Sequence, residues 1–475
     1  MLFSSNIFLF LFLPAVLAIY FLLHNRSLKN AFLFLASLFF YAWGEIYFVF
    51  AMLAVIVFNF RLAMLIDTKR DNSGTKKLLL FIAIAGDLSL LFYYKYFNFA
   101  IETLNRFILP AEYTLPLKNI TLPIGISFFT FQAISYVIDV YRGTVPVQTK
   151  FIPIGLYISL FPQLIAGPIV RYGTVAEEIE RRKETFVDFS YGVRRFIIGF
   201  GKKMLLANNM ALIADRAFST ADPERSVTFA WLGAAAYSLQ ILFDFSGYSD
   251  MAIGLGRMFG FKFLENFNYP YISRSISEFW RRWHISLGSW FRDYVYIPLG
   301  GSRVKAPRLM FNLFVVWVLT GAWHGAHWHF VAWGLLYFML ITFEKMTGLP
   351  AKLKSAPAKV AYQFLVLIAV LGGWVLFRAD GLRAAAKYAL SMAGMRGNPL
   401  ICGPAIGMIR DYWIFLLFAL LCSTPVFSII KTRLEETVLG HIAAILSVVF
   451  YLLIFVWSFS FIIVGAHNPF IYFNF

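Results

Sequence analysis

Three histidines lie close together in the block Trp323-His324-Gly325-Ala326-His327-Trp328-His329, inside a long apolar run. Ionisable side chains at membrane depth are costly, and they usually face a polar cavity or a partner. Counted from Phe311, His324 lies about 20 Å along a helix. Burial would keep its imidazole neutral, and a neutral imidazole is a good general base near pH 7. His324 is therefore a candidate base for proton transfer.

Other roles for these histidines stay open on the residues alone. A buried histidine is often only a hydrogen-bond partner, and we weigh this role equally with catalysis. Offsets of three and five residues, with no nearby carboxylate, match catalytic zinc spacing poorly, so we expect no metal. Haem would need a ligand on another helix, and His441 is the one other histidine within an apolar run.

A second candidate block runs from Phe279 to Tyr294 and mixes aromatic, basic and histidine side chains. At helical spacing, one face would carry Phe279, Trp283, Leu287, Trp290 and Tyr294, and the opposite face Arg281, His284, Gly288 and Arg292. This pattern is typical of a helix lying in the membrane interface. The basic face could also hold an anionic ligand such as a phosphate-bearing cofactor. Spacing does not choose between a lipid phosphate and a cofactor phosphate.

Composition places both blocks in a membrane. Of 475 residues, 60% are apolar and 14% are charged, with 54 Phe and 12 Trp. Soluble domains are about 45–50% apolar and carry far more charge. These values exclude an ordinary soluble enzyme, a disordered protein and a disulfide-rich secreted scaffold. We predict an all-α polytopic membrane protein that forms a single transmembrane domain over residues 1–475.

Apolar runs long enough for a crossing predict about 9 to 13 transmembrane segments. They lie near 6–23, 31–60, 78–109, 123–141, 152–170, 190–214, 227–256, 309–342, 358–377, 412–430 and 439–465. The run 31–60 is too long for one crossing, and Gly44-Glu45 interrupts it. The run 309–342 must tilt or break, and Gly321 and Gly325 are the available break points.

The formal net charge of +17 comes from 42 Lys and Arg against 25 Asp and Glu. Basic residues gather in short gaps between the apolar runs, so we expect them to face anionic lipid in cytoplasmic loops rather than nucleic acid. The gaps 61–77, 171–203 and 303–308 are predicted to be cytoplasmic, and 110–122 external. The run Asn6–Leu23 has no preceding basic residue, which predicts a retained first helix that starts outside.

Two aspartates interrupt the run 227–256. Asp244 and Asp250 flank Phe245-Ser246-Gly247-Tyr248-Ser249. They could line a cavity or pair with Arg257, and hydrogen bonding between helices is an equal alternative. Cys402 and Cys422 allow at most one disulfide and do not indicate a redox compartment.

These blocks resemble the membrane-bound O-acyltransferase (MBOAT) family. The resemblance rests on Phe279–Ser286 continued through Trp290–Tyr294 to Tyr296–Gly301, and on Trp323-His324-Gly325. The segments 123–132, 243–254 and 468–473 are most similar to the bacterial branch of the alginate O-acetyltransferase membrane subunit and its peptidoglycan- and cellulose-acetylating relatives. The family implies about eleven transmembrane helices, with re-entrant or interfacial helices, around a central channel.

The resemblance also implies a reaction and its site. His324 matches the family's catalytic histidine, and His284 its second motif histidine on the cytoplasmic side. The branch takes acetyl groups from cytoplasmic acetyl-CoA, used as a substrate, and delivers them to a polysaccharide outside the bacterial inner membrane. It works with a periplasmic or extracellular partner of the SGNH-hydrolase type. The expected substrate tunnel is lined by Arg281, Arg282, Trp283, Trp290, Asp293, Trp323 and Gly325.

Two other functions are kept as alternatives. D-alanyl transfer to teichoic acid from a carrier protein would use the same architecture with a different acyl donor. A transporter for lipid-linked sugars would use the histidines as proton relays. No internal inverted repeat is visible in the sequence to favour a transporter.

Overall fold

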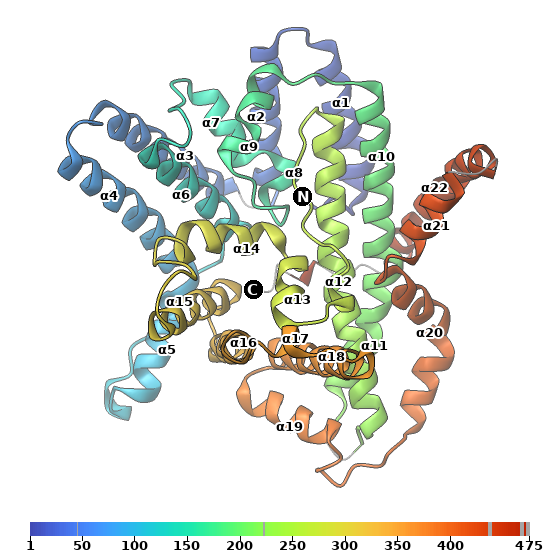
Figure 1. The fold of residues 1–475 in the computed structure, drawn as a ribbon. Coiled ribbons are helices and arrows are strands. Elements are labelled where there is room, and N and C mark those ends of the chain that lie inside the picture. The colour runs from blue at the N-terminus through green and yellow to red at the C-terminus, as the bar shows by residue number, and fades with distance from the viewer. Residues whose placement is uncertain (45, 222–223, 436–438, 466–469, 472–475) are drawn as a thin grey trace. The chain divides into compact units, whose positions relative to one another are not determined.

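The computed structural model describes residues 1–44, 46–221, 224–435, 439–465 and 470–471, and in these residues every regular element is a helix. Backbone contacts divide the chain into two compact units. One unit contains residues 1–193 and 252–264, and the other contains 194–251 and 265–475. A single domain over 1–475 stays a prediction. Figure 1 labels the helices.

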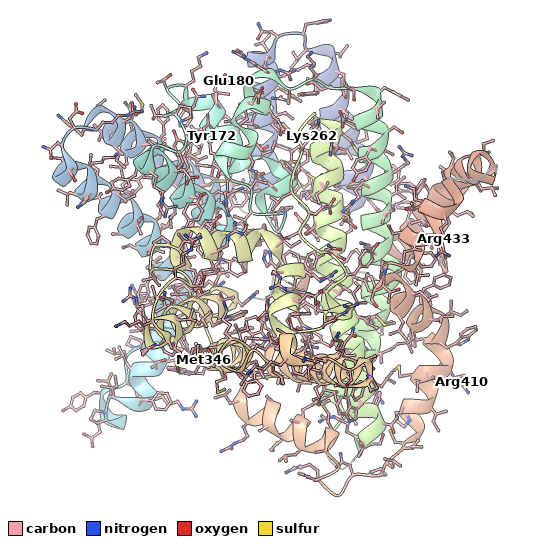
Figure 2. The ribbon with its side chains drawn as sticks, viewed as in Figure 1. Tyr172, Glu180, Lys262, Met346, Arg410 and Arg433 are labelled. Atoms are coloured by element: carbon pink, nitrogen blue, oxygen red, sulfur yellow. The ribbon has the colours of Figure 1, made fainter. Side chains whose placement is uncertain are left out.

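The first unit is built from short and medium helices. They are η1 (Phe8–Phe12), α1 (Leu13–Leu22), α2 (Arg26–Ala42), α3 (Ile46–Thr68), α4 (Ser73–Leu91), η2 (Phe92–Tyr96), α5 (Phe97–Phe107), η3 (Ala111–Tyr113), α6 (Ile126–Arg142), α7 (Phe151–Ser159), α8 (Phe161–Leu164) and α9 (Tyr172–Arg181). The long run 31–60 is split into α2 and α3 around Gly44, as predicted. The side chains of Tyr172 and Glu180 on α9 are labelled in Figure 2, and both accept hydrogen bonds from Gln148.

A buried arginine anchors the basic gap after α9. The Arg182 guanidinium donates to the Phe259 carbonyl at 3.0 Å, the Tyr20 hydroxyl at 3.1 Å and Asn30 Oδ1 at 2.7 Å. Burial disfavours ionisation of the nearby Glu184, but hydrogen bonds from Arg26 and Tyr20 outweigh it and lower its pKa to about 2. This part of the gap is therefore folded structure and not only a solvated basic loop.

The second unit contains the two candidate blocks. Its helices are α10 (Phe186–Gly201), η4 (Lys202–Ala207), α11 (Asn208–Ser219), α12 (Val227–Met258), η5 (Pro270–Ile272), α13 (Ile276–Arg282), α14 (Ile285–Phe291), η6 (Arg292–Tyr296), α15 (Ala306–His324), α16 (Trp328–Thr347), α17 (Leu349–Lys352), α18 (Ala356–Arg378), α19 (Leu382–Met392), α20 (Gly403–Cys422), α21 (Val426–Glu435) and α22 (Leu439–Ile463). The ends of α10 and α12 belong to the first unit. The side chains of Arg410 on α20 and Arg433 on α21 project outward in Figure 2.

Nine helical stretches in the described part of the chain are long and apolar enough to cross a membrane. They are Ile46–Thr68, Ser73–Phe107, Phe186–Ser219, Val227–Met258, Ala306–His324, Trp328–Thr347, Ala356–Arg378, Gly403–Cys422 and Ile445–Ile463. The multi-pass all-α class is therefore confirmed, and nine lies within the predicted range of crossings. Both α2 and α6 have 17 residues, about five turns, which is the lower limit of the length for a crossing.

The long apolar run 309–342 breaks as its length required. Helix α15 ends at His324, Gly325 takes an extended φ of −172°, and α16 begins at Trp328. Gly321, the other predicted break point, lies inside α15. A Cβ on Gly321 would meet the Phe330 carbonyl oxygen at 2.4 Å, and one on Gly334 would meet the Trp317 carbonyl oxygen at 2.3 Å. The two glycines let α15 and α16, which lie side by side in Figure 1, approach closely.

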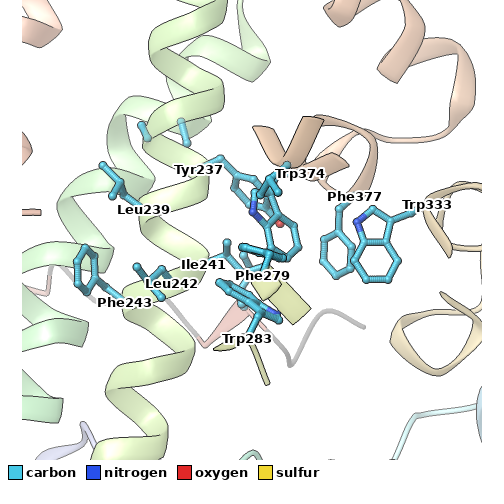
Figure 3. Packing of buried hydrophobic residues seen from close by; sticks show 14 of the residues in the cluster. Tyr237, Leu239, Ile241, Leu242, Phe243, Phe279, Trp283, Trp333, Trp374 and Phe377 are labelled. Atoms are coloured by element: carbon cyan, nitrogen blue, oxygen red, sulfur yellow. The ribbon is translucent and has the colours of Figure 1, made fainter. Parts of the chain in front are cut away.

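Aromatic side chains fill the interior beside α15 and α16. Figure 3 shows part of this cluster, in which Trp283, Trp333 and Trp374 are almost fully buried. The rings of Trp283 and Trp374 lie 4.7 Å apart, and those of Trp333 and Phe377 5.3 Å apart. Such rings remove large apolar areas from water and fit closely with little conformational freedom. They form a rigid wall for the candidate site.

Candidate active site

His284 lies at the junction of two short helices. The block 279–294 was predicted as one amphipathic helix, and this is wrong: α13 ends at Arg282 and α14 begins at Ile285. His284 between them adopts φ 45° and ψ 54°, a left-handed conformation that costs a non-glycine residue about 1–3 kcal/mol. The aromatic face is buried as expected. The break, however, turns His284 inward, so that it is 1% exposed while Arg281 and Arg292 remain exposed.

Asn266 holds the His284 ring. Asn266 Oδ1 lies 3.2 Å from His284 Nδ1, and it accepts hydrogen bonds from the Ser286 amide at 3.1 Å and the Ser286 hydroxyl at 2.9 Å. Asn266 Nδ2 donates to Ser249 Oγ at 3.2 Å. The amide orientation is assigned from this network, and it makes Nδ1 of His284 the protonated nitrogen. His284 Nε2 then carries the lone pair.

The Nε2 atom of His284 is buried and has no hydrogen-bond partner among the described residues. Buried polar atoms are normally satisfied, so this nitrogen makes His284 a candidate to bind a ligand group. Burial lowers the pKa of His284 from 6.5 to about 3. The imidazole is therefore neutral at physiological pH, and its Nε2 can accept a hydrogen bond.

A cavity of about 360 Å³ opens beside His284. Aromatic side chains, including Trp280 and Trp283, form much of its wall, and three cations line it: Arg281, Arg292 and Lys345. An apolar cavity with a few polar groups and a basic rim suits a ligand with an apolar arm and an anionic end.

His324, the last residue of α15, is 3% exposed and lies among aromatic rings. Its ring centroid is 5.0 Å from Trp323, 5.1 Å from Trp333 and 5.2 Å from Phe377, and all three contacts are edge-on. Trp323 also contacts His284, at 5.7 Å. One indole therefore lies between the two histidines and links the two candidate blocks.

Several expected tunnel residues lie near this centre and others point elsewhere. Arg281 and Trp283 line the cavity beside His284, and Trp323 and Gly325 flank His324. The Arg282 guanidinium instead binds Glu278 at 2.9 Å and the Asn268 carbonyl at 3.2 Å. Asp293 pairs with Arg292 at 2.6 Å. Trp290 is buried against Tyr294 and is not among the cavity-lining residues.

The aspartates of α12 form ion pairs with α10 and η4. Asp250 contacts Arg195 at 2.6 Å and Lys202 at 2.7 Å, and Asp244 contacts Lys203 at 2.5 Å. Arg257, the partner considered from sequence, pairs with Asp188 at 2.8 Å, so the proposed pairing with Arg257 is wrong. His467 and most of the closing segment 468–473 lie outside the described residues, as does the His441 side chain.

Sequence reasoning missed two residues that support the site. Asn266 gave no signal, because a single asparagine 18 residues before His284 belongs to no motif. Glu344 was also missed. Its buried carboxylate accepts hydrogen bonds from the Ile276 amide at 2.6 Å, the Ser277 amide at 2.9 Å and the Tyr362 hydroxyl at 2.9 Å. It thereby caps the N-terminus of α13, the helix that leads to His284.

The fold and the site define a multi-pass helical membrane protein with two buried histidines on either side of one tryptophan, and one of them, His284, lines a basic cavity. The chain belongs to the membrane-bound O-acyltransferase family. The family model, described as "MBOAT, membrane-bound O-acyltransferase family", matches residues 147–353. The protein is accordingly an O-acyltransferase of the bacterial inner membrane.

Curated relatives agree with this assignment. The chain is 44% identical over 387 residues to "Probable alginate O-acetylase AlgI" of Pseudomonas aeruginosa, covering 81% of this chain and 73% of the relative. It is 35% identical over 434 residues to the peptidoglycan O-acetyltransferase of Helicobacter pylori, covering 84% and 81%. It is 32% identical over 246 residues to the teichoic acid D-alanyltransferase of Bacillus subtilis, covering 48% and 62%.

Proposed function

We propose that this protein transfers acetyl groups from cytoplasmic acetyl-CoA to hydroxyl groups of an extracytoplasmic polysaccharide, with an exopolysaccharide such as alginate as the acceptor. Relatives named as alginate and peptidoglycan O-acetylating proteins cover more than four fifths of the chain, which supports acetyl as the acyl group. The observation that carries the proposal is that His284, which lines a basic cavity, approaches Trp323, and that Trp323 in turn contacts His324.

The cavity beside His284 is the proposed acyl-donor site. Acetyl-CoA is anionic at its nucleotide end and has an uncharged pantetheine arm. Arg281, Arg292 and Lys345 would bind the phosphates, and Trp280 and Trp283 would contact the arm. With Nδ1 bound to Asn266, His284 Nε2 is a hydrogen-bond acceptor, and an amide N–H of the pantetheine arm is a suitable donor.

His324 is the proposed general base. Its imidazole takes the proton of the acceptor hydroxyl as the oxygen attacks the thioester carbonyl. A C–O bond forms, the C–S bond breaks, and the proton passes from His324 to the departing thiolate, which leaves as free CoA. The chain leaves α15 at Gly325, so backbone amides at this break are candidates to stabilise the oxyanion, together with Trp323.

The final acceptor is either the glycan itself or a hydroxyl of a partner that then acylates the glycan. An extracytoplasmic partner of the SGNH-hydrolase type is part of the proposal, because acetyl groups that cross the membrane must be delivered to specific sugar hydroxyls. Reconstitution with and without such a partner would distinguish the two routes.

The deciding experiment measures thioester loss from radiolabelled acetyl-CoA by purified protein in nanodiscs, with partner and glycan supplied. Replacement of a general base lowers rates by about 10²–10⁴-fold, so His324→Ala should lose at least 100-fold. His329→Ala is the matched control, because His329 lies in the same block but outside the aromatic contacts of His324, and it should stay within about threefold of wild type.

Full activity of His324→Ala would overturn the role of His324. No turnover of acetyl-CoA by wild type, combined with turnover of a D-alanyl carrier protein, would replace acetyl with D-alanyl transfer. Sugar-lipid flux without any acyl transfer would favour a transporter.

A further inference from the structure

A second cavity, of about 670 Å³, lies in the unit that carries both histidines. It is enclosed by residues of α11, α18, α19 and α20 and shares no lining residue with the cavity beside His284. Four cations and two carboxylates line it: Arg216, Arg225, Arg378, Lys387, Asp215 and Asp380. The proposed reaction assigns no role to it.

Two of these cations are committed to the fold. Arg378 Nη2 lies 2.5 Å from Asp215 Oδ1. The Arg225 guanidinium is buried, donates to the Ala217 carbonyl at 2.8 Å and lies over the Tyr388 ring at 4.5 Å. Arg225 therefore fastens the end of α11 to α19.

The other two cations are exposed and available. No carboxylate among the described residues lies within ion-pair distance of Arg216 or Lys387, one on α11 and one on α19. Because they line one cavity from two different helices, a ligand can engage both. Arginine and lysine arranged in this way favour carboxylate or phosphate oxygens.

Aromatic rings complete the wall. Tyr388 is stacked on Phe218 at 4.1 Å with an interplanar angle of 13°, and half-buried Tyr412 faces the cavity from α20. Asp380, also at the cavity, can accept hydrogen bonds from ligand hydroxyls. Cations, an aromatic ring and a hydroxyl acceptor in one open cavity can together bind an acidic sugar.

One residue that lines the cavity is the sequence neighbour of a residue that contacts the candidate catalytic histidine. Arg378 follows Phe377, whose ring is 5.2 Å from His324, and the Arg378 guanidinium lies 5.6 Å from the centroid of the buried Tyr237 ring. Helix α15 starts within the basic gap 303–308, at Ala306, and ends at His324. Since α16 returns and α18 crosses again, Arg378 lies at the end opposite that gap, on the predicted extracytoplasmic side.

We infer that this cavity is an acceptor subsite that binds carboxylate-bearing sugar residues through Arg216 and Lys387. The inference rests on the proposed function, because an acceptor subsite has a role only if the protein transfers acetyl groups toward an acidic polysaccharide. Uronate units carry one carboxylate per sugar, so neighbouring units can reach two cations on different helices. Neutral glycans would gain nothing from either cation.

The test measures binding of a mannuronate hexamer to purified protein in phosphatidylcholine nanodiscs, without acetyl-CoA. The double variant Arg216→Ala/Lys387→Ala should weaken binding at least tenfold, and added salt should weaken wild-type binding. Arg383→Ala is the matched control, because Arg383 is an exposed cation on α19 that does not line the cavity. It should change binding less than twofold. Cellohexaose, a neutral hexamer, should bind wild type at least tenfold more weakly.

Equal binding by wild type and the double variant would overturn the inference. So would equal affinity for cellohexaose, or a loss with Arg383→Ala as large as that of the double variant, which would indicate diffuse charge. Binding of phosphatidylglycerol to the cavity, with no binding of the hexamer, would assign the cavity to lipid headgroups. That result would also overturn the inference. The binding assay contains no acyl donor, so it tests the subsite separately from acyl transfer. If the protein turns over acetyl-CoA in the activity assay but does not bind the hexamer, only this subsite is refuted. If it binds the hexamer without acyl transfer, the proposed function is refuted instead.

Discussion

Asn266 Oδ1 lies 3.2 Å from His284 Nδ1, although the two residues are 18 positions apart in the sequence. This contact decides which ring nitrogen of His284 carries the proton. The same oxygen accepts from the amide and hydroxyl of Ser286, so His284 Nδ1 must donate to it. Second partners of this kind fix both the tautomer and the ring orientation of functional histidines. Asn266 is thus a positioning residue, which acts through His284.

Replacing Asn266 should impair the reaction without removing any group that touches substrate. Loss of a positioning partner typically costs about 10- to 100-fold in activity, so Asn266→Ala should lower kcat by that amount. Asn266→Asp would place a carboxylate beside Nδ1 and favour the imidazolium, which should shift the acid limb of the pH–rate profile upward. Ser249→Ala, which removes one hydrogen bond to Asn266, is the control for general loosening. A wild-type pH profile in Asn266→Asp would contradict this role.

Burial of His284 makes the stability of the protein depend on pH. The pKa of His284 is lowered to about 3 in the folded protein, against 6.5 when unfolded. Between these values the unfolded state binds the extra proton. The contribution of neutral His284 to the free energy of unfolding is therefore complete above pH 6.5. It is lost as pH falls from 6.5 toward 3, by about 2 kcal/mol at pH 5.

His284→Asn provides the comparison for this pH effect. Asparagine tolerates the left-handed backbone and does not titrate. Thermal unfolding midpoints of both proteins in detergent, from pH 8 to pH 5, should show the wild type losing more stability than the variant. A constant difference between the two thermal midpoints from pH 8 to pH 5 would show that His284 has the same pKa in the folded and unfolded protein.

Glu344 should stabilise the helix that carries the cavity residues. Glu344→Ala leaves two helix N-terminal amides and the Tyr362 hydroxyl without their buried acceptor, which should cost about 3 kcal/mol. Tyr362→Phe removes one of these hydrogen bonds and should cost about 1 kcal/mol. Both changes can be measured as shifts of the thermal midpoint. Equal effects of the two variants would mean that the amides of α13 find another acceptor.

Close packing of α15 on α16 should depend on the absence of a side chain at Gly334. A Cβ there would lie 2.3 Å from the Trp317 carbonyl oxygen, so the helices must separate in Gly334→Ala. Overpacking of this kind costs about 1–3 kcal/mol, and displacement of α15 should also reduce acyl transfer. Gly372→Ala is the matched control in α18, because nothing lies within 4 Å of its added methyl group. If Gly334→Ala and Gly372→Ala were destabilised equally, the cause would be helix flexibility and not the packing of α15 on α16.

The two neighbouring arginines of α13 should differ in their effect on the acyl donor. Arg281 lines the cavity, whereas Arg282 is bound to Glu278 and the Asn268 carbonyl. Arg281→Ala should raise the KM for acetyl-CoA about tenfold with little change in kcat, as expected for the loss of a charge-assisted contact. Arg282→Ala should leave KM within about threefold and lower the thermal midpoint. The reverse order of KM effects would place the donor phosphates on the other side of α13.

Composition and periodicity were enough to predict the class of this protein and much of its local pattern. Membrane-spanning segments can be assigned from sequence because each crossing must bury its own backbone and side chains in lipid. The break near Gly44, the break at Gly325 and the burial of the aromatic face of 279–294 follow from the same local rules. Motif resemblance also pointed to the two histidines that the fold brings together.

Only the tertiary structure decided what surrounds those histidines. Periodicity assumed a continuous helix across 279–294 and placed His284 on an exposed basic face, but contacts with Asn266 and Phe245 hold it at a buried helix junction. Asn266, Trp323 and Glu344 come from separate elements, and no spacing along the chain encodes their approach. The sequence by itself determined which segments enter the membrane, because transfer into lipid is a local property of a segment. Side-chain partners at the site depend on packing between distant segments, and therefore only the folded chain decided them.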